Sequence, residues 1–223
     1  MRKLISLIVL SLLLGSNAIA EGFKVGLSGN IQGFYGVGTE TVDNGSNTGT
    51  VKTSEAGAFD HEDVSIFVEY DMGPMSVGIE YHPDDIETPE NVNVRHTSAL
   101  DSTPLRNTVK ADFEDLTTLY AIIDIPFAGM YLKAGYVQAD IETRESLATG
   151  SKYPNVDTSG FTAGFGFEHA VDSLFVRLEA TASQYDDVSA SSTSSESEQT
   201  TAHKVDIDDM MSAHAKISIG YAF

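Results

Sequence analysis

Hydrophobic and polar residues alternate along most of this chain with a period of two, the pattern of a β-strand whose two faces meet different environments. In the clearest case, every second residue from Met211 to Phe223 is apolar. The positions between them are polar or small: Ser212, His214, Lys216, Ser218 and Gly220. Eight segments follow the pattern, near 23–37, 62–72, 75–82, 117–125, 130–137, 161–168, 174–183 and 211–223. Phe34 and Phe67 are exceptions, because each falls among the polar positions of its segment.

The connections between these segments are of two kinds. Three are short and rich in turn-forming residues: Gly73–Pro74, Pro126–Gly129 and Ala170–Ser173. Four are long and polar, near 39–60, 83–111, 144–158 and 186–209. In an antiparallel meander the two kinds lie at opposite ends, and all six prolines fall in turns or loops. Strand boundaries near 108–118 and 137–143 stay open, and the ambiguous alternation beyond Val137 is compatible with a β-bulge there.

Two architectures fit eight such strands. A soluble sandwich or lipocalin-like barrel turns its apolar face inward, whereas a transmembrane barrel turns it toward lipid. The polar face mixes charged residues with glycines, namely Gly26, Gly36, Gly78, Gly135, Gly164, Gly166 and Gly220. Small residues mixed with charges suit a narrow, filled interior, and a continuous aliphatic face suits lipid. The pattern therefore favours an all-β, eight-stranded antiparallel up-and-down transmembrane β-barrel.

The amino terminus predicts export. Arg2 and Lys3 precede an apolar run from Leu4 to Leu14, and Ala18-Ile-Ala20 forms a small-x-small cleavage site. We therefore expect a signal peptide at 1–20 and a barrel domain at 21–223. The chain has no cysteine, so no disulfide supports the fold. Its formal net charge of −20 argues against nucleic acid as a partner, because phosphate contacts need clustered lysine and arginine.

The carboxy terminus carries the most specific motif. Lys216, Tyr221 and the final Phe223 resemble the terminal sorting signal of bacterial outer-membrane barrels, although Ser218 stands where that family usually has glycine. The whole mature chain resembles the eight-stranded OmpA/OmpX/opacity-type, porin-like barrels. The resemblance implies a protein of the bacterial outer membrane with periplasmic turns and extracellular loops, in contact with lipid and lipopolysaccharide. It also implies insertion by the barrel-assembly machinery, and a structural or surface-interaction role in which the loops can meet an extracellular ligand.

The polar faces predict a network of charged side chains in the lumen. Its members are Lys24, Glu69, Glu80, Asp124, Lys133, Glu168, Arg177, Glu179 and Lys216. Eight strands leave a lumen that side chains can fill, so we expect mutually paired charges that plug the barrel. The alternative is a small porin or narrow conduit for ions or small solutes.

No catalytic, cofactor or metal site is predicted. Three of the six histidines, His61, His96 and His203, fall in predicted loops, and His214 on the lumen face is best explained as a hydrogen-bond partner. The acidic groups at 84–87 and 206–209 lack the spacing of a calcium-binding loop and suit solvated loops. An enzyme acting on lipid remains the third and weakest hypothesis.

Overall fold

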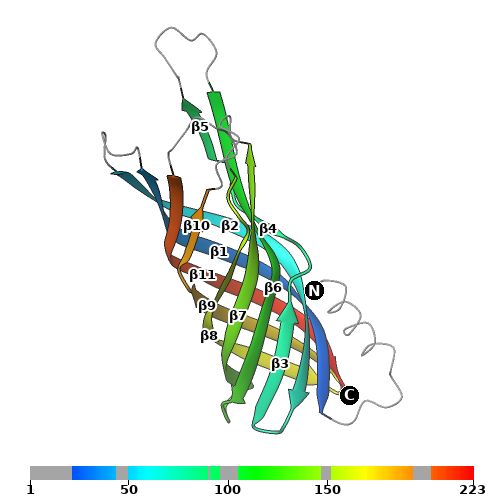
Figure 1. Ribbon diagram of the computed structural model, residues 1–223. Coiled ribbons are helices and arrows are strands. Elements are labelled where there is room, and N and C mark those ends of the chain that lie inside the picture. Colours follow the sequence, from blue (N-terminus) through cyan, green and yellow to red (C-terminus); the bar gives the residue numbers. More distant parts are fainter. Residues whose placement is uncertain (1–21, 44–49, 90, 96–104, 147–151, 193–201) are drawn as a thin grey trace.

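The structure is a closed barrel of antiparallel strands (Figure 1). The computed structural model describes residues 22–43, 50–89, 91–95, 105–146, 152–192 and 202–223. The barrel strands are β1 (Phe23–Asp43), β2 (Thr50–Asp71), β3 (Met75–Tyr81), β6 (Leu105–Asp124), β7 (Met130–Ser146), β8 (Val156–Val171), β9 (Leu174–Tyr185) and β11 (Ala202–Ala222). Each pairs with the next, and β11 pairs with β1 to close the ring. The predicted eight-stranded antiparallel barrel is confirmed, whereas the predicted signal peptide lies outside the described residues.

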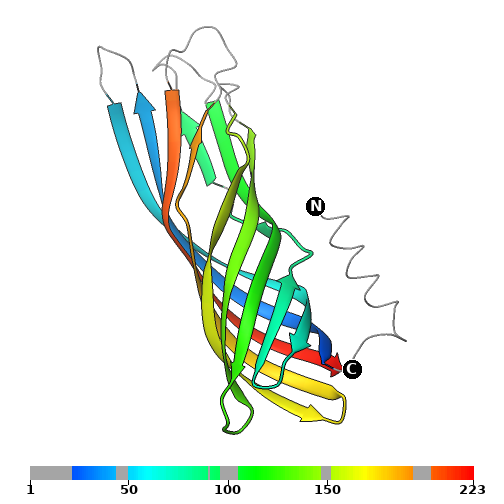
Figure 2. The same cartoon turned by 60° about the horizontal axis from the view of Figure 1, so that its bottom comes forward.

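The strands extend further at one end than the alternation predicts. The short turns after β2, β6 and β8 lie at one end of the barrel, and the long hairpins rise from the other (Figure 2). The range 39–60, expected as a loop, is mostly a regular hairpin in which β1 and β2 pair as far as Asp43 and Thr50. Ladder hydrogen bonds continue here although neither face has the apolar alternation that marks a lipid-facing strand. The connections themselves, 44–49, 96–104, 147–151 and 193–201, lie outside the described residues.

Three further strands lie at the long-hairpin end. β4 (Ile86–Glu87) and β5 (Asn91–Arg95) pair with β6, and β10 (Val188–Ser191) pairs with β11. β3 is short, and its last residue Tyr81 pairs with Ile66 of β2. Within the described residues, no helix is long and apolar enough to cross a membrane.

The two faces of the sheet have the polarity of a membrane barrel. On β1, the outward Leu27 and Ile31 are 53% and 60% exposed, whereas the inward Asn30 and Gln32 are 3% and 1% exposed. The same division holds on β9, where Leu178 faces out and Arg177 and Glu179 face in. A soluble barrel would bury the apolar set instead. The outward face therefore suits lipid, and the inward face holds the polar residues.

Two β-bulges reverse the inward and outward positions near the long-hairpin end. β6 has one extra residue between Glu114 and Thr117 opposite β7, and β11 has one extra residue opposite Tyr35 and Val37 of β1. Each bulge contains an aspartate with positive φ, Asp115 at 52° and Asp209 at 54°, a conformation that aspartate tolerates better than most residues. Shifting a strand by one residue moves its side chains to the other face. Beyond the bulges, apolar residues of β6 and β11 consequently turn inward.

The β-bulge that the sequence allowed after Val137 lies on the neighbouring strand. β7 itself is continuous from Met130 to Ser146, with Val137, Ala139 and Ile141 all buried inside the barrel. The extra residue is in β6, around Asp115. The backbone of Asp115 adopts the positive φ that accommodates this residue.

Pairs of an aromatic residue and a glycine fill the interior near the short-turn end. Four lumen aromatics each lie opposite a glycine of the neighbouring strand: Phe67 and Gly26, Tyr120 and Gly78, Tyr131 and Gly166, Phe175 and Gly220. A Cβ added at any of these glycines would overlap the partner ring. This packing explains both Phe67 on a polar face and the glycines spread among the lumen charges.

We predict that Gly166→Ala destabilises the barrel by about 1–3 kcal/mol, because the new methyl group would occupy the position of the Tyr131 ring. The measurement is urea-induced unfolding in lipid vesicles, followed by far-UV circular dichroism. Gly33→Ala is the control, since an added Cβ there meets nothing within 4 Å. Equal unfolding free energies for the two variants would contradict the packing role of the glycine.

Candidate functional site

The interior contains a charged layer near the short-turn end, which we define as Lys24, Glu69, Glu80, Lys133, Glu168, Arg177, Glu179 and Lys216. One half is centred on Arg177, which is 5% exposed. Its guanidinium donates to both carboxylate oxygens of Glu69, at 2.6 Å from Nη2 to Oε2, and its Nε donates to Glu168 at 2.6 Å. Lys24 extends the network to the rim, 3.1 Å from Glu168 and 3.2 Å from Asp71.

Aromatic rings surround the same guanidinium. The Arg177 Cζ atom lies 4.9 Å from the ring centre of Phe175, 5.3 Å from that of Phe67 and 5.5 Å from that of Tyr131. Ring faces attract a planar cation, and this attraction is stronger in a desolvated site such as this one. The aromatics that pack over glycines therefore also hold the central charge of the layer.

The other half of the charged layer is centred on Glu80. Lys216 Nζ lies 2.7 Å from both of its carboxylate oxygens, and Lys133 Nζ lies 3.1 Å from Oε2. Lys133 also donates to Glu179 at 2.9 Å, and its ammonium lies 3.9 Å from the ring centre of Tyr120. Four carboxylates thus meet four basic groups, so the layer is neutral although it is buried. Paired charges can fill a lumen, because each charge is compensated by its partner. Isolated charges could not, because the free energy of burying an unpaired charge is too high.

The structure brings together eight of the nine charged residues singled out from the sequence. Asp124 stays apart, because its side chain is exposed at the end of β6. Sequence reasoning missed the hydroxyl groups that complete the layer. Tyr120 donates to Glu69 at 2.7 Å, Tyr131 to Glu179 at 2.9 Å, and Ser65 to Glu80 at 2.7 Å. Their inward positions were visible in the alternation, but aromatic residues on a polar face gave no sign of a specific partner.

A second group of polar side chains lies inside the barrel, between the charged layer and the long-hairpin end. We call it the polar step and define it as Asn30, Gln32, Asp63, His82 and His214. His82 Nδ1 contacts the Asp63 carboxylate, and its ring is only 2% exposed although the sequence places it at a strand end. His214 Nε2 lies 2.7 Å from Ser212 Oγ, while its Nδ1 and both amide atoms of Gln32 have no hydrogen-bond partner among the described residues. Buried polar atoms of this kind are ordinarily satisfied by ordered water.

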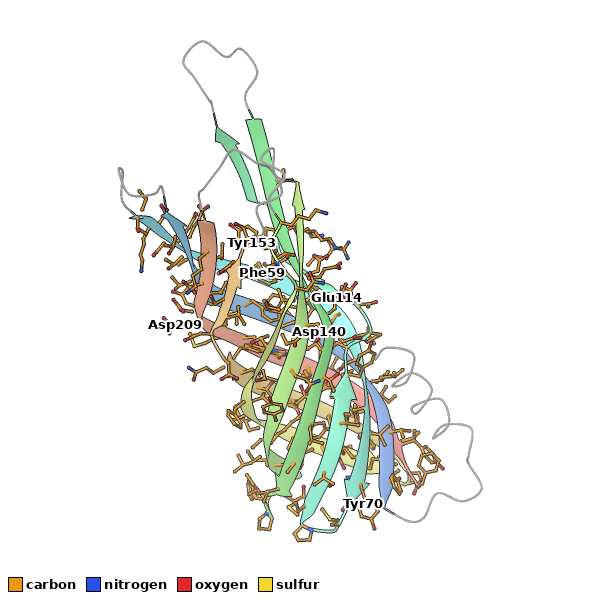
Figure 3. All side chains as sticks on the ribbon, viewed as in Figure 1. Phe59, Tyr70, Glu114, Asp140, Tyr153 and Asp209 are labelled. Atoms are coloured by element: carbon orange, nitrogen blue, oxygen red, sulfur yellow. The ribbon has the colours of Figure 1, made fainter. Side chains whose placement is uncertain are left out.

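Above the polar step the interior becomes apolar. Phe34 stacks on Phe59 at 4.9 Å between ring centres and on Phe113 at 5.7 Å. Leu116, Ile141, Tyr185 and Met210 pack against them. Figure 3 shows Phe59 in the upper half of the barrel, far from Tyr70 at the opposite end of the same strand. The bulges create this region. Without the extra residue in each strand, Asp112 of β6 and Asp208 of β11 would point into the barrel here instead of apolar side chains.

A cavity of about 870 Å³ opens above these rings. Its floor includes Phe34, Phe59 and Tyr185, and one wall consists of Gly36, Gly38 and Gly57 on the inner face of the β1–β2 hairpin. Gly36 and Gly57 are cross-strand neighbours, so their missing side chains leave a flat surface. The volume lies within the range of sites that hold small apolar ligands.

The hydrogen-bonded ladder of the barrel is interrupted beside this cavity. Beyond Ile66, the strand β2 is hydrogen-bonded to β1 but, among the described strands, to nothing on its other side. β4 instead continues along β6, where Ile86 pairs with Phe113. Cavity-lining residues lie on both sides of the gap, with Phe59 on β2 and Thr88 and Pro89 after β4. The interruption of the ladder therefore lies at the level of the cavity.

Comparison with known proteins yields matches to solved structures alone. No family model matches the chain, and no curated protein does. OprG of Pseudomonas aeruginosa is 16% identical, with 91% of this chain and 96% of that chain covered and a TM-score of 0.49. Ail of Yersinia pestis, solved with the heparin analogue sucrose octasulfate, is 12% identical, with 92% and 100% covered and a TM-score of 0.39. The outer-membrane protease OmpT of Escherichia coli is 9% identical, with 93% and 99% covered and a TM-score of 0.45.

The closed ring with apolar residues outside and paired charges inside decides the class of fold. This chain folds as an eight-stranded transmembrane β-barrel. Exposed aromatic residues mark both borders of its apolar band: Tyr35, Tyr136 and Phe161 toward the long hairpins, and Tyr70, Phe127 and Phe167 toward the short turns. Of the predicted sorting-signal residues, Tyr221 and Phe223 form an edge contact at 5.0 Å at the short-turn end, and Lys216 belongs to the charged layer.

The remaining candidate residues of this barrel protein are scattered. His169 is exposed near the end of β8, and His96 lies outside the described residues. Among the residues that the structure describes, no three histidine, aspartate or glutamate side chains are grouped so that they could hold a metal ion. At the outer surface, Lys110 contacts Glu87 at 2.5 Å, and this contact lowers the pKa of the Glu87 carboxyl.

We predict that Arg177→Met destabilises the barrel by about 3–5 kcal/mol, because it leaves the carboxylate of Glu69 buried and unpaired. The measurement is equilibrium unfolding in urea. Lys204→Met is the control and should cost less than about 1 kcal/mol, since the Lys204 side chain is 49% exposed and its partner Asp206 is also partly exposed. Glu69→Leu combined with Arg177→Met should recover part of the lost unfolding free energy, because it removes the unpaired carboxylate. If the double variant loses as much stability as the two single variants together, Glu69 and Arg177 do not act as a pair.

Proposed function

We propose that this barrel binds a small apolar molecule in the cavity at its long-hairpin end and admits that molecule through the gap beside β2. The cavity above Phe34 and Phe59 carries the proposal, because its lining is mostly apolar and the ladder of β2 is interrupted beside it. Apolar compounds concentrate in membranes, so a side entrance near the border of the apolar band suits them better than a water-filled channel does. The long hairpins would then lie on the outer face of the membrane.

The charged layer supports binding rather than free passage. Its members come from seven of the eight barrel strands, including Lys24 of β1, Glu80 of β3 and Lys216 of β11, and Tyr120 of β6 donates to Glu69. An ion would have to separate buried pairs with several bonds each, which is costly. The small-porin alternative is therefore disfavoured. An enzyme is the weakest of the three candidates, because His214, which contacts Ser212, has no hydrogen bond from Nδ1 to a carboxylate among the described residues.

A structural or surface-interaction role is a second candidate. The β1–β2 hairpin continues for several residues beyond Tyr35, the last outward aromatic of β1. Such a projection can present the connecting loops to an extracellular partner. This role concerns the connection at 44–49 and its neighbours, and it is compatible with a ligand held in the cavity.

Naphthalene titrated into the isotope-labelled barrel in lipid nanodiscs tests apolar binding. We expect saturable chemical-shift changes at the amides of Gly36, Gly38 and Gly57, which line the cavity. Gly29 and Gly33 face outward and report naphthalene dissolved in the bilayer, so their shifts should rise without saturation.

Gly57→Leu should abolish the saturable shifts, because an added side chain there meets no atom within 4 Å of its Cβ and fills the cavity without displacing the fold. Gly33→Leu is the matched control on the same sheet and should leave the shifts unchanged. Saturable binding that survives in Gly57→Leu would place the ligand elsewhere and overturn the proposal.

Planar-bilayer recording tests closure of the lumen. We expect the wild-type barrel to show no stepwise conductance, because the charged layer blocks the path of an ion. Arg177→Ala combined with Lys133→Ala removes two of the four basic side chains of the charged layer. This double variant should show a measurable ion conductance. Regular open-channel steps in the wild type would favour the conduit instead.

A further inference from the structure

We infer that the ligand of the cavity presents a flat aromatic ring, which packs on the backbone of Gly36 and Gly57 and stacks beside Phe59. This ligand class rests on the proposed apolar site and narrows it from apolar molecules in general to aromatic ones. The barrel packs its own aromatic side chains on glycines in the same way, and at the cavity one such pair of glycines is left uncovered.

Near the short-turn end, an aromatic ring covers a glycine of the neighbouring strand in four places. The pairs are Phe67 on Gly26, Tyr120 on Gly78, Tyr131 on Gly166 and Phe175 on Gly220. A Cβ built on any of these glycines would overlap the ring, so each ring lies directly on the glycine backbone. Inside this barrel, an inward glycine is therefore a place where a flat ring fits.

The inward glycines at the cavity carry no such ring among the described residues. Gly36 and Gly57 are cross-strand neighbours, and both line the cavity. A Cβ added at Gly57 meets none of the described atoms within 4 Å, and one added at Gly36 has its nearest contact, Met210 Cγ, at 3.5 Å. The space that the chain fills with its own rings near the short turns is thus part of the cavity here.

The row of side chains next to these glycines is aromatic. Phe34 and Phe59 are also cross-strand neighbours, and each lies two residues from one of the glycines on the same inward face. Their rings are stacked, with centres 4.9 Å apart and an interplanar angle of 11°. Successive inward rows of a strand are about 7 Å apart, so a ring on the glycine pair lies beside the Phe34 and Phe59 rings.

An aromatic ligand gains contacts here that a saturated one lacks. Aromatic rings attract one another through their quadrupoles, in addition to the burial of apolar area that any hydrocarbon contributes. A flat ring can also lie close to two adjacent glycine backbones. The cavity, at about 870 Å³, is large enough for a saturated ring system too, so the ring contacts and not size decide the preference.

Naphthalene and trans-decalin, which has the same carbon skeleton with saturated rings, test the inference in lipid nanodiscs. Each is titrated into the isotope-labelled barrel, and saturation of the Gly36 and Gly57 amide shifts gives its Kd relative to its concentration in the bilayer. We expect naphthalene to bind about fivefold to tenfold more tightly, because stacking on two rings adds to apolar burial. If decalin binds as tightly as naphthalene or more tightly, the inference is overturned and the apolar site stands. If neither molecule saturates the shifts, the apolar site itself is overturned.

Phe59→Leu tests the stacking contact, because it removes one ring and keeps the lining apolar. This variant should reduce the preference for naphthalene over decalin by at least about twofold. Phe165→Leu is the matched control, since its side chain faces outward and is 60% exposed, and it should leave the preference unchanged. A preference that stays at its wild-type value in Phe59→Leu would overturn the stacking beside Phe59.

Discussion

The pairing of β1 with β11 is the constraint on which the rest of the structure depends. Once the ladder is closed, every residue of a strand faces either lipid or a narrow interior, and the period of two assigns each position to one side. The interior is too small for loose water near the short turns, so its charges must be paired. Arg177 and Glu80 accordingly serve as the two centres of a neutral layer, and rings over glycines fill the remaining space.

The two β-bulges divide the barrel into parts with opposite interiors. Below them, the inward positions of β6 and β11 hold Thr118, Ser212 and Lys216; above them, the inward positions hold Phe113 and Ile207. One extra residue per strand thus converts a polar lumen into an apolar cavity without changing the order of strands. The early end of β3 at Tyr81 interrupts the ladder beside that cavity, and this is where we propose that a ligand enters.

Much of the barrel could be predicted from alternation, because lipid outside and charge inside impose strict periodicity. The eight segments, the short turns and most members of the charged layer follow from it. Phe34 and Phe67 looked like errors of the pattern, yet both are inward residues whose partners, Phe59 and Gly26, come from another strand. The bulges at Asp115 and Asp209 were not predictable, because aspartate occurs in loops and on polar faces alike and its positive φ is a property of the backbone. The cavity depends on those bulges, so it could not be predicted either.

The central claim is that one barrel contains an apolar cavity above a closed charged layer. A crystal structure determined under xenon pressure tests it most directly, since xenon binds in apolar cavities. The account predicts xenon between the Phe34 and Phe59 rings and the Gly57 backbone, with none among Arg177, Glu80 and their partners. A continuous file of water from the long hairpins through the charged layer, with no xenon above Phe34, would contradict it.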